Sequence, residues 1–290
     1  MPLERIEKIP TLPKRPADSN KGMYGTVLVV AGGRGMAGAA ALCAASCLRS
    51  GAGLVRVACS AEVQPVVASF EPSYMTYPLA HDGDGLIRFE PAREAIEKFL
   101  PNTDVLAVGP GLGQSDEVRR FVRWVVESVN VPTVLDADGL NALVGQTELF
   151  RKLRRPLIVT PHPGEFARLT GSAVEQVQSD RQGQAAALAS LSEWLVVVLK
   201  GTSTVVTDGR RVYVNTTGNP GMATGGAGDV LTGVIAALLG QKLSPFEAAQ
   251  FGVYVHGLAG DIARDQNGEV GMIAGDLVDA LPDAFFHLQS

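Results

Sequence analysis

The feature that most constrains this chain is a repeated unit. In it, a short run of valine, leucine and isoleucine ends in a glycine-rich or acidic turn, and a helix-forming segment follows. Such runs occupy residues 25–31, 104–108, 132–135, 157–160 and 194–199. Runs this apolar are typical of parallel strands buried on both faces. At least five strand-then-helix alternations predict a three-layer α/β/α fold with a mainly parallel central sheet, and no repeat of fixed period or low-complexity linker divides it.

Residues 25–58 are predicted to form a strand–helix–strand unit. Its Gly33, Gly35 and Gly38 have the spacing of a dinucleotide-binding fingerprint. That fingerprint requires an acidic residue at the end of the second strand, and Cys59 followed by serine stands there instead. The pattern therefore argues against a Rossmann dinucleotide site.

The remaining elements follow from hydrophobic periodicity and cap residues. A β-hairpin is expected at 205–214, and residues 71–89 are expected to be an irregular excursion. Helices are predicted at 63–69, 91–100, 115–129, 166–169, 185–191, 230–239, 246–263 and 275–288.

The stretch 219–229 has the composition of an anion site at the start of a helix. Gly225, Gly226 and Gly228 precede an apolar helical segment. Glycines let a backbone approach a ligand closely, and helix N-termini present unpaired N–H groups to anions. Asp229 stands directly after them, as a helix cap or as a group that takes a proton. Residue type alone leaves both roles open.

Polar residues follow two other predicted strands. Asp136 and Asp138 come after 132–135, and one of them could face the ligand crevice, although an Asx turn with a helix cap is the alternative. His162 lies between two prolines on a rigid turn, and Glu165 stands three residues later. A structural role for His162 and a helix-dipole role for Glu165 remain open.

The strand at 194–199 ends in a lysine, a glycine and three hydroxyl residues, a set that can bind phosphate by charge and hydrogen bonds. A Walker-type phosphate loop has a different spacing and is absent from the sequence. On the long helix 246–263, His256 is expected to be a packed core residue.

Charge and cysteine content exclude several functional classes. The net charge is −5, with 46% hydrophobic and 19% charged residues, so neither nucleic acid nor a membrane surface is an expected partner. Cys43, Cys47 and Cys59 are expected to be buried free thiols in a reducing compartment. The proline-rich residues 1–20 lack the apolar core of a signal peptide, and a cytoplasmic location is expected.

Five motifs together resemble the ADP/ATP-dependent NAD(P)H-hydrate dehydratases, which are metabolite-repair enzymes of the ribokinase-like superfamily. They are, in family order, 109–113 (GPGLG), 136–141 (DADGLN), 160–165 (TPHPGE), 200–204 (KGTST) and 219–229. Each is weak alone, but the set covers nearly the whole chain. The resemblance implies a single ribokinase-like dehydratase domain over residues 1–290, without the epimerase domain of fused members.

The resemblance also implies roles for individual residues. Nucleotide contacts would come from Lys200, Gly201, Thr202, Ser203, Thr204, Gly225, Gly226 and Gly228. Substrate contacts would come from Ala39, Gly111 or Gly113, His162 and Asp229. Glu165 would help to hold Mg²⁺ through water, in the family's manner of binding, and Asp229 would be the general base. The chain has Ala227 where the family usually has Thr or Ser, so one hydroxyl contact to phosphate is lost.

The implied reaction uses ADP or ATP to phosphorylate the C6 hydroxyl of hydrated NADH or NADPH, and phosphate then leaves to restore the dinucleotide. A homotetramer and a separate epimerase are the implied partners. A ribokinase-like kinase of a small hydroxyl-bearing metabolite is the alternative enzyme. A nucleotide sensor without catalysis is the alternative from another class.

Overall fold

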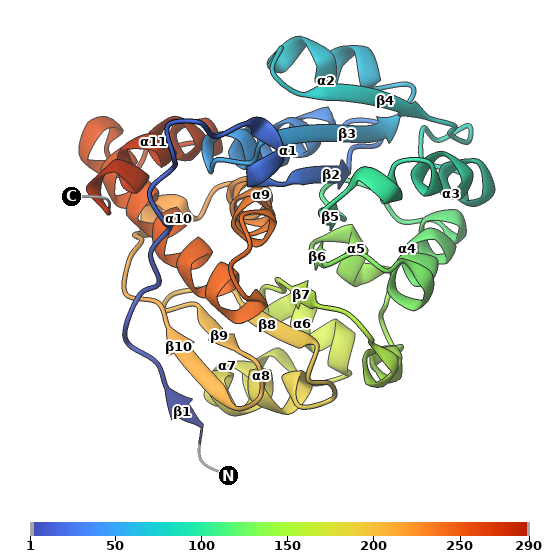
Figure 1. The fold of residues 1–290 in the computed structure, drawn as a ribbon. Coiled ribbons are helices and arrows are strands. Elements are labelled where there is room, and N and C mark those ends of the chain that lie inside the picture. Colours follow the sequence, from blue (N-terminus) through green and yellow to red (C-terminus); the bar gives the residue numbers. More distant parts are fainter. Residues whose placement is uncertain (1–2, 289–290) are drawn as a thin grey trace.

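The computed structural model describes residues 3–288. Its ten strands form one sheet in the order β1-β10-β9-β8-β7-β6-β5-β2-β3-β4 (Figure 1). The strands are β1 (Glu4–Arg5), β2 (Thr26–Val30), β3 (Leu54–Ser60), β4 (Met75–Leu79), β5 (Val105–Val108), β6 (Thr133–Leu135), β7 (Leu157–Val159), β8 (Leu195–Leu199), β9 (Val205–Thr207) and β10 (Arg211–Val214). Only β9 pairs antiparallel with its neighbours, so the prediction of a mainly parallel sheet is confirmed.

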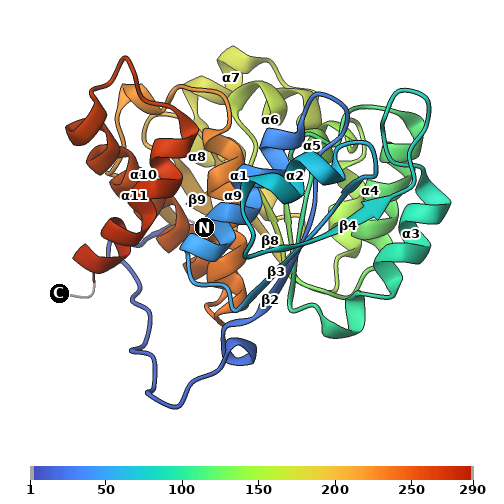
Figure 2. The ribbon, with the colours of Figure 1, turned by 90° about the horizontal axis from the view of Figure 1, so that it is seen from above.

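Helices cover both faces of the sheet (Figures 1 and 2). They are α1 (Ala37–Arg49), α2 (Gln64–Phe70), α3 (Phe89–Glu97), α4 (Asp116–Ser128), α5 (Asp138–Asn141), α6 (Pro163–Thr170), α7 (Val174–Ser179), α8 (Arg181–Ala189), α9 (Ala227–Gly240), α10 (Pro245–Asn267) and α11 (Ala274–His287). None of these helices, within residues 3–288, is long and apolar enough to cross a bilayer.

Alternate residues of each central strand enter two separate cores. In β2, Val27 and Val29 pack with α1, α9 and α10 on one face, whereas Leu28 and Val30 pack with α4 on the other. Side chains of a strand point to opposite faces in turn, which explains why strands in a three-layer fold are apolar throughout. The three cysteines are buried free thiols in this structure, as expected.

The region 71–89 is not wholly irregular, and this expectation was wrong. It contains β4, which pairs in parallel with β3 along the edge of the sheet. The strand escaped notice because its pattern is that of an edge: Met75 and Pro78 are exposed, and only Leu79 is buried. A proline is tolerated there because an edge strand leaves one side of its backbone unpaired.

The sheet reverses its order of growth beside β2, since β3 and β4 lie on one side of it and β5 to β8 on the other. Ligands in open parallel sheets commonly bind at such a point. Here the turn after β2 and the turn after β5 are hydrogen-bonded to each other. The Gly32 amide donates to the Pro110 carbonyl at 2.9 Å, and the Gly33 amide donates to the Gly111 carbonyl at 2.7 Å. The space directly above β2 and β5 is thus filled by backbone.

Candidate active site

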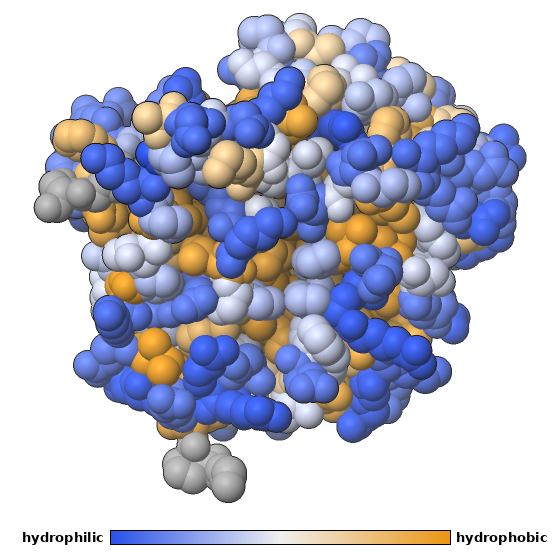
Figure 3. Space-filling view, viewed as in Figure 1, coloured by the Kyte–Doolittle hydropathy of each residue, from blue (hydrophilic) through white to orange (hydrophobic). Residues whose placement is uncertain are grey.

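A cavity of about 770 Å³ lies beyond the carboxyl ends of β6 to β8, next to the switch point. Each of these strands is followed at once by part of the lining: Asp136 after β6, His162 after β7, and Lys200 after β8. The first turn of α9, the loop 215–224 and α10 form the rest of the wall. Figure 3 shows the opposite edge of the sheet, at the amino ends of these strands, where polar side chains cover most of the face and apolar side chains are visible near its centre.

Helix α9 begins at the glycine turn that the sequence singled out. Gly226 has φ 93°, a conformation that favours glycine, and no side chain caps this helix. The Ala227 amide donates to the Thr224 carbonyl at 3.5 Å, whereas the amides of Gly228 and Asp229 have neither an intrahelical partner nor a capping side chain. Ala227 and Gly228 line the cavity, so these amides border a space that can hold an anion.

Asp229 lies in the same turn and lines the same cavity. Burial disfavours its charged form, and the nearby charge of Asp136 adds to the effect, whereas Lys200 opposes it; together they raise the pKa of Asp229 to about 7. A carboxylate with such a pKa can accept a proton at neutral pH and later return it. A simple exposed helix cap has no reason to be shifted in this way.

A buried ion pair supports the floor of the cavity. The Lys200 ammonium lies 2.7 Å from Asp136 Oδ1 and 3.8 Å from Glu165 Oε2. Thr232 of α9 donates its hydroxyl to the other oxygen of Asp136 at 2.8 Å. Burial alone would lower the pKa of Lys200, but Asp136 and Glu165 outweigh it and the pKa is raised, so the amine stays charged. The amine predicted to bind phosphate is thus already paired with a carboxylate.

The rest of the predicted nucleotide segment lines the cavity as well. Gly201, Thr202 and Ser203 are exposed, and Thr204 is half-buried beside them. Arg181 of α8 holds this turn from behind, because its guanidinium donates to the carbonyls of residues 199, 200 and 202. The turn is therefore fixed through its backbone; Thr204 donates its hydroxyl to the Gly201 carbonyl at 3.0 Å, and the hydroxyl groups of Thr202 and Ser203 remain available.

His162 and Glu165 form the start of α6. The His162 ring accepts hydrogen bonds at Nδ1 from the amides of residues 164 and 165, while Glu165 accepts from the His162 amide at 2.8 Å. This is a capping box in which histidine replaces the usual hydroxyl residue. His162 also lines the cavity and has a side chain that is half exposed. The structural role left open for both residues is present, and for His162 it coexists with access to the cavity.

The acidic pair after β6 does not behave as a continued strand. Ala137 has φ 48°, so the backbone turns sharply between the two acids. Asp136 reaches Lys200, whereas Asp138 starts α5 and accepts a hydrogen bond from the Gly113 amide at 2.8 Å. Of the two, Asp136 faces the cavity.

Several predicted site residues lie outside this cavity. A Cβ atom added to Gly111 would lie 3.1 Å from the Ala39 Cβ, so these two are neighbours, but neither lines the cavity. Gly113 is covered by Leu86 and bonded to Asp138. Gly225 lines an adjoining groove instead.

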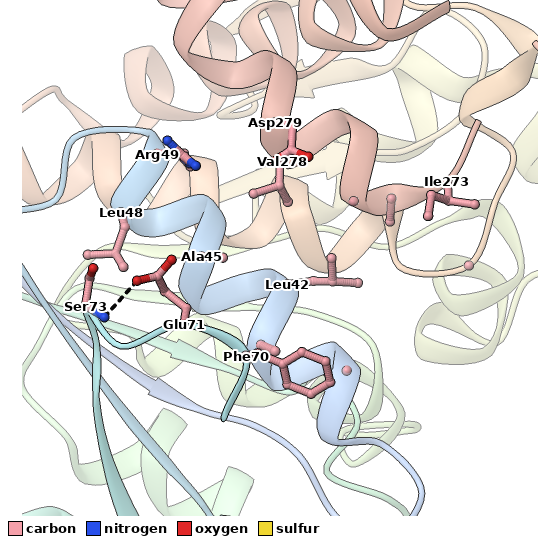
Figure 4. Close-up of a pocket in the computed structure, with 15 residues that line it drawn as sticks. Leu42, Ala45, Leu48, Arg49, Phe70, Glu71, Ser73, Ile273, Val278 and Asp279 are labelled. Carbon is pink, nitrogen blue, oxygen red and sulfur yellow. Dashed lines mark hydrogen bonds between the residues drawn. The ribbon is translucent and has the colours of Figure 1, made fainter. Parts of the chain in front are cut away.

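That groove has a volume of about 840 Å³ and lies between α1 and α11 (Figure 4). Leu42, Leu48, Val278 and the exposed Phe70 and Ile273 give it an apolar wall. Because it contains few convergent polar groups, it lacks the features of a catalytic pocket.

Sequence reasoning missed much of the cavity wall. The loop after the β9–β10 hairpin contributes Asn215, Thr216 and Thr217, and α10 contributes Val253 and His256. His256 is 9% exposed, as expected of a core residue, yet it also borders the cavity. Its position on a helix distant in sequence gave no signal of this.

Residues 3–288 contain no group of three or more His, Cys, Asp or Glu side chains that could hold a metal ion. Glu165, the predicted Mg²⁺ residue, is 6% exposed and already bonded to the His162 amide. Mg²⁺ usually keeps several waters and binds through one or two carboxylates together with substrate phosphates. The residues present therefore fit an ion carried by a phosphate ligand rather than one held in a protein cage.

Comparison with known proteins places this architecture in a family. The NAD(P)H-hydrate dehydratase family matches residues 27–283. The chain is 46% identical over 281 residues to the bifunctional NAD(P)H-hydrate repair enzyme of Moorella thermoacetica. The aligned region covers 96% of this chain and 52% of that protein. It thus spans about half the length of the bifunctional relatives. It is 37% identical over 275 residues to the ADP-dependent (S)-NAD(P)H-hydrate dehydratase of Bacillus subtilis, which covers 94% of this chain and 93% of that protein.

Solved structures agree. The ADP/ATP-dependent NAD(P)H-hydrate dehydratase of Bacillus subtilis, co-crystallised with ATP and Mg²⁺, matches with a TM-score of 0.82 and 34% identity over 96% of this chain and 95% of that one. A ribokinase-like superfamily protein of Enterococcus faecalis matches with a TM-score of 0.78 and 28% identity over 96% and 92%. The fold is ribokinase-like, and the chain belongs to the NAD(P)H-hydrate dehydratase family.

Proposed function

We propose that this chain dehydrates the S epimer of hydrated NADH or NADPH, with ADP or ATP as co-substrate. Asp229 carries the proposal: a carboxylate with a pKa of about 7 stands in the first turn of α9, beside amides that border a cavity. That arrangement suits a hydroxyl group that must lose a proton while it attacks a phosphoryl group. Family membership and the names of the relatives supply the substrate class.

The cavity has room for both ends of a nucleotide. The amides of the α9 turn would receive the phosphates, helped by the hydroxyl groups of Thr202 and Ser203. The wall formed by Thr217, Met222 and Val253 would receive the nucleoside. Lys200 would add positive charge at a distance, since Asp136 already pairs with its ammonium group. Ala227 provides no hydroxyl, so phosphate binding in this turn would rest on backbone amides.

The chemistry would then proceed in two balanced steps. The C6 hydroxyl oxygen attacks the terminal phosphoryl group and Asp229 accepts the hydroxyl proton, so an O–P bond forms and the shortened nucleotide leaves. The C6–O bond next breaks as phosphate departs, driven by the electron pair of the ring nitrogen, and loss of the C5 proton restores the C5–C6 double bond. Mg²⁺ held by the phosphates, with Glu165 acting through water, would neutralise charge on the transferring group.

The substrate would approach Asp229 from the side of His162, Ala39 and the glycine loop. His162 borders the cavity, and Ala39 touches the Gly111 turn nearby. Which glycine of this loop contacts substrate would depend on Gly113, whose amide is already bonded to Asp138. Gly111 is therefore the better candidate.

We also propose that residues 1–290 act as one domain and that the protein forms a homo-oligomer, a tetramer by family resemblance, in the cytoplasm. A separate epimerase is the proposed partner, because several relatives are bifunctional repair enzymes. The exposed Phe70 and Ile273 beside the groove of Figure 4 support self-association. Light scattering of the purified chain should give a mass that is a multiple of 30.4 kDa, and a monomer would refute this part.

The test of function is direct. The protein, hydrated NADH or NADPH, Mg²⁺ and either ADP or ATP should regenerate the absorbance of the dihydronicotinamide and release phosphate. Consumption of nucleotide without recovery of absorbance would instead indicate a kinase that releases a phosphorylated product. Tight nucleotide binding without turnover would indicate a sensor.

A further inference from the structure

His256 of α10 makes a hydrogen bond that reaches into the start of α9. Its Nε2 lies 2.9 Å from the carbonyl oxygen of Ala227. A carbonyl oxygen only accepts, so Nε2 must carry the hydrogen. Burial lowers the pKa of His256 to about 4, and the ring is therefore neutral at physiological pH. The tautomer is fixed by this contact, with Nδ1 left as the lone-pair nitrogen.

Ala227 occupies a critical place in the anion-binding turn. It is the first residue of α9 and lies between Gly226 and Gly228, both of which line the cavity. Because α9 has no side-chain cap, its own side chains hold the first turn only from the carbonyl side, where the Thr232 hydroxyl donates to the Gly228 carbonyl at 3.1 Å. In contrast, α6 and α10 each begin with a capping box. A capping oxygen on α9 would occupy the very amides that an anion needs.

Helix α10 fixes the opposite wall of the cavity in the same manner. Asp261 accepts hydrogen bonds from the Gly218 amide at 2.9 Å and from the Asn219 side chain at 3.0 Å. Thr217 donates its hydroxyl to the Tyr254 carbonyl at 2.8 Å. One helix thus anchors both the loop 215–219 and the turn that follows it, and His256 supplies its hydrogen bond to the start of α9.

We propose that His256 is a positioning residue for the anion site: its Nε2–H holds the Ala227 carbonyl and thereby orients the uncapped amides of Gly228 and Asp229 toward the phosphates of a nucleotide. It takes the place of an N-cap by holding the helix from the carbonyl side, which leaves the amides of Gly228 and Asp229 free for the ligand. The inference rests on the proposed function, because it takes a nucleoside polyphosphate as the ligand.

Two amide variants of similar polarity test this geometry. In His256→Gln the side-chain amide nitrogen can reach about the place of Nε2, whereas in His256→Asn it falls short, near the place of Nδ1. Loss of one buried hydrogen bond of about 1.4 kcal/mol corresponds to a tenfold change in affinity. Titration calorimetry should show ADP binding weakened about tenfold in His256→Asn and largely restored in His256→Gln. Adenosine, which has no phosphate, should bind all three proteins equally.

A matched control comes from the loop 81–87, where His81 Nδ1 lies 2.7 Å from the Asp82 carbonyl and outside the cavity lining. His81→Asn should leave ADP affinity unchanged. The inference is overturned if His256→Asn binds ADP normally, if adenosine weakens as much as ADP, or if His256→Gln is as impaired as His256→Asn. If the unaltered protein fails to bind ADP at all, it is the proposed function that fails.

Discussion

The turn at Gly225–Asp229 and the loop at Gly109–Gly113 both combine glycines with a nearby carboxylate at the same edge of the sheet. In the loop, the glycines are needed because neighbouring atoms leave no room for a side chain. A Cβ at Gly109 would lie 1.8 Å from the Asp136 carbonyl oxygen, and one at Gly113 would lie 2.5 Å from Leu86. In the turn, a Cβ at Gly225 would meet nothing within 4 Å. Glycine thus serves close packing in the loop, whereas in the turn only Gly226 is tightly packed, with a Cβ 2.6 Å from Leu42, and Gly225 and Gly228 have more open surroundings.

Their carboxylates differ in the same sense. The Asp138 carboxylate accepts a hydrogen bond from the Gly113 amide of the loop at 2.8 Å. Asp229 stands in a cavity wall, and burial raises its pKa to about 7. A carboxylate that accepts hydrogen bonds from amides stabilises a conformation, whereas a carboxylate whose pKa lies near 7 can exchange a proton at neutral pH.

The largest expected effect comes from Asp229→Asn, which tests whether the two regions differ in kind. Turnover should fall by about 10²- to 10⁴-fold, while calorimetry should find ADP affinity nearly unchanged. Asp138→Asn, its counterpart in the packed loop, should keep most of its activity and lose stability instead. A near-normal rate in Asp229→Asn would mean that Asp229 is not the general base.

The same variant should be more stable. The folded-state pKa of Asp229 lies above the ordinary value of 3.8, so the stability it contributes is present below about pH 4 and is lost as the pH rises through about 7. Asparagine removes that loss, and at pH 8 the Tm of Asp229→Asn should exceed that of the unaltered protein by about 2–4 °C for each kcal/mol gained. Scanning calorimetry at pH 5 and pH 8 should show a difference that grows with pH.

Asp136 joins the two regions, because its carbonyl packs on Gly109 and its carboxylate pairs with Lys200. Asp136→Asn leaves a buried ammonium without its partner, at a cost of about 3–5 kcal/mol in urea unfolding. In the unaltered protein, kcat/KM should rise with pH through an apparent pKa of about 7. Since the charge of Asp136 raises the pKa of Asp229, that limb should move to lower pH in the variant. If the apparent pKa of kcat/KM stays near 7 in the variant, Asp229 is not the group whose loss of a proton controls the rate.

A pair of glycine substitutions compares the packing roles directly. Gly109→Ala places a Cβ against the Asp136 carbonyl at φ 128° and should cost at least about 2 kcal/mol in urea unfolding. Gly225→Ala should leave the free energy of unfolding unchanged and alter turnover by less than about twofold, because the space around this glycine is open. Equal stabilities would contradict the distinction drawn here between packing and access.

Only a small effect is expected of Gly228→Ala. Its Cβ would lie 3.2 Å from the Lys200 ammonium, at the end of a long side chain that can move slightly. Folding should be little affected, and ADP affinity should weaken by about threefold as the new methyl group crowds the phosphate side of the cavity. An effect as large as that of Gly109→Ala would mean that this turn, too, is packed rather than open.

The sequence by itself determined the layers of the fold and the location of the site. Apolar strands alternating with helices leave few topologies, and parallel strands bring all their following turns to one edge, so Asp136, His162, Lys200 and Asp229 could be expected to gather there. It also identified the glycine turn before α9, because glycines and a helix start are local features. The edge strand β4 escaped this reasoning, since an edge strand has no continuous apolar signal.

Only the tertiary structure decided how each of these groups is used. The pairing of Lys200 with Asp136 and the contact of His256 with Ala227 join residues from different elements, and local propensity carries no information on such distances. The choice between cap and catalyst for Asp229 likewise depended on burial and on charges from other strand ends, which set its pKa. The type of a residue sets which reactions and contacts its side chain can make. Its neighbours in the folded protein set which of them it does make.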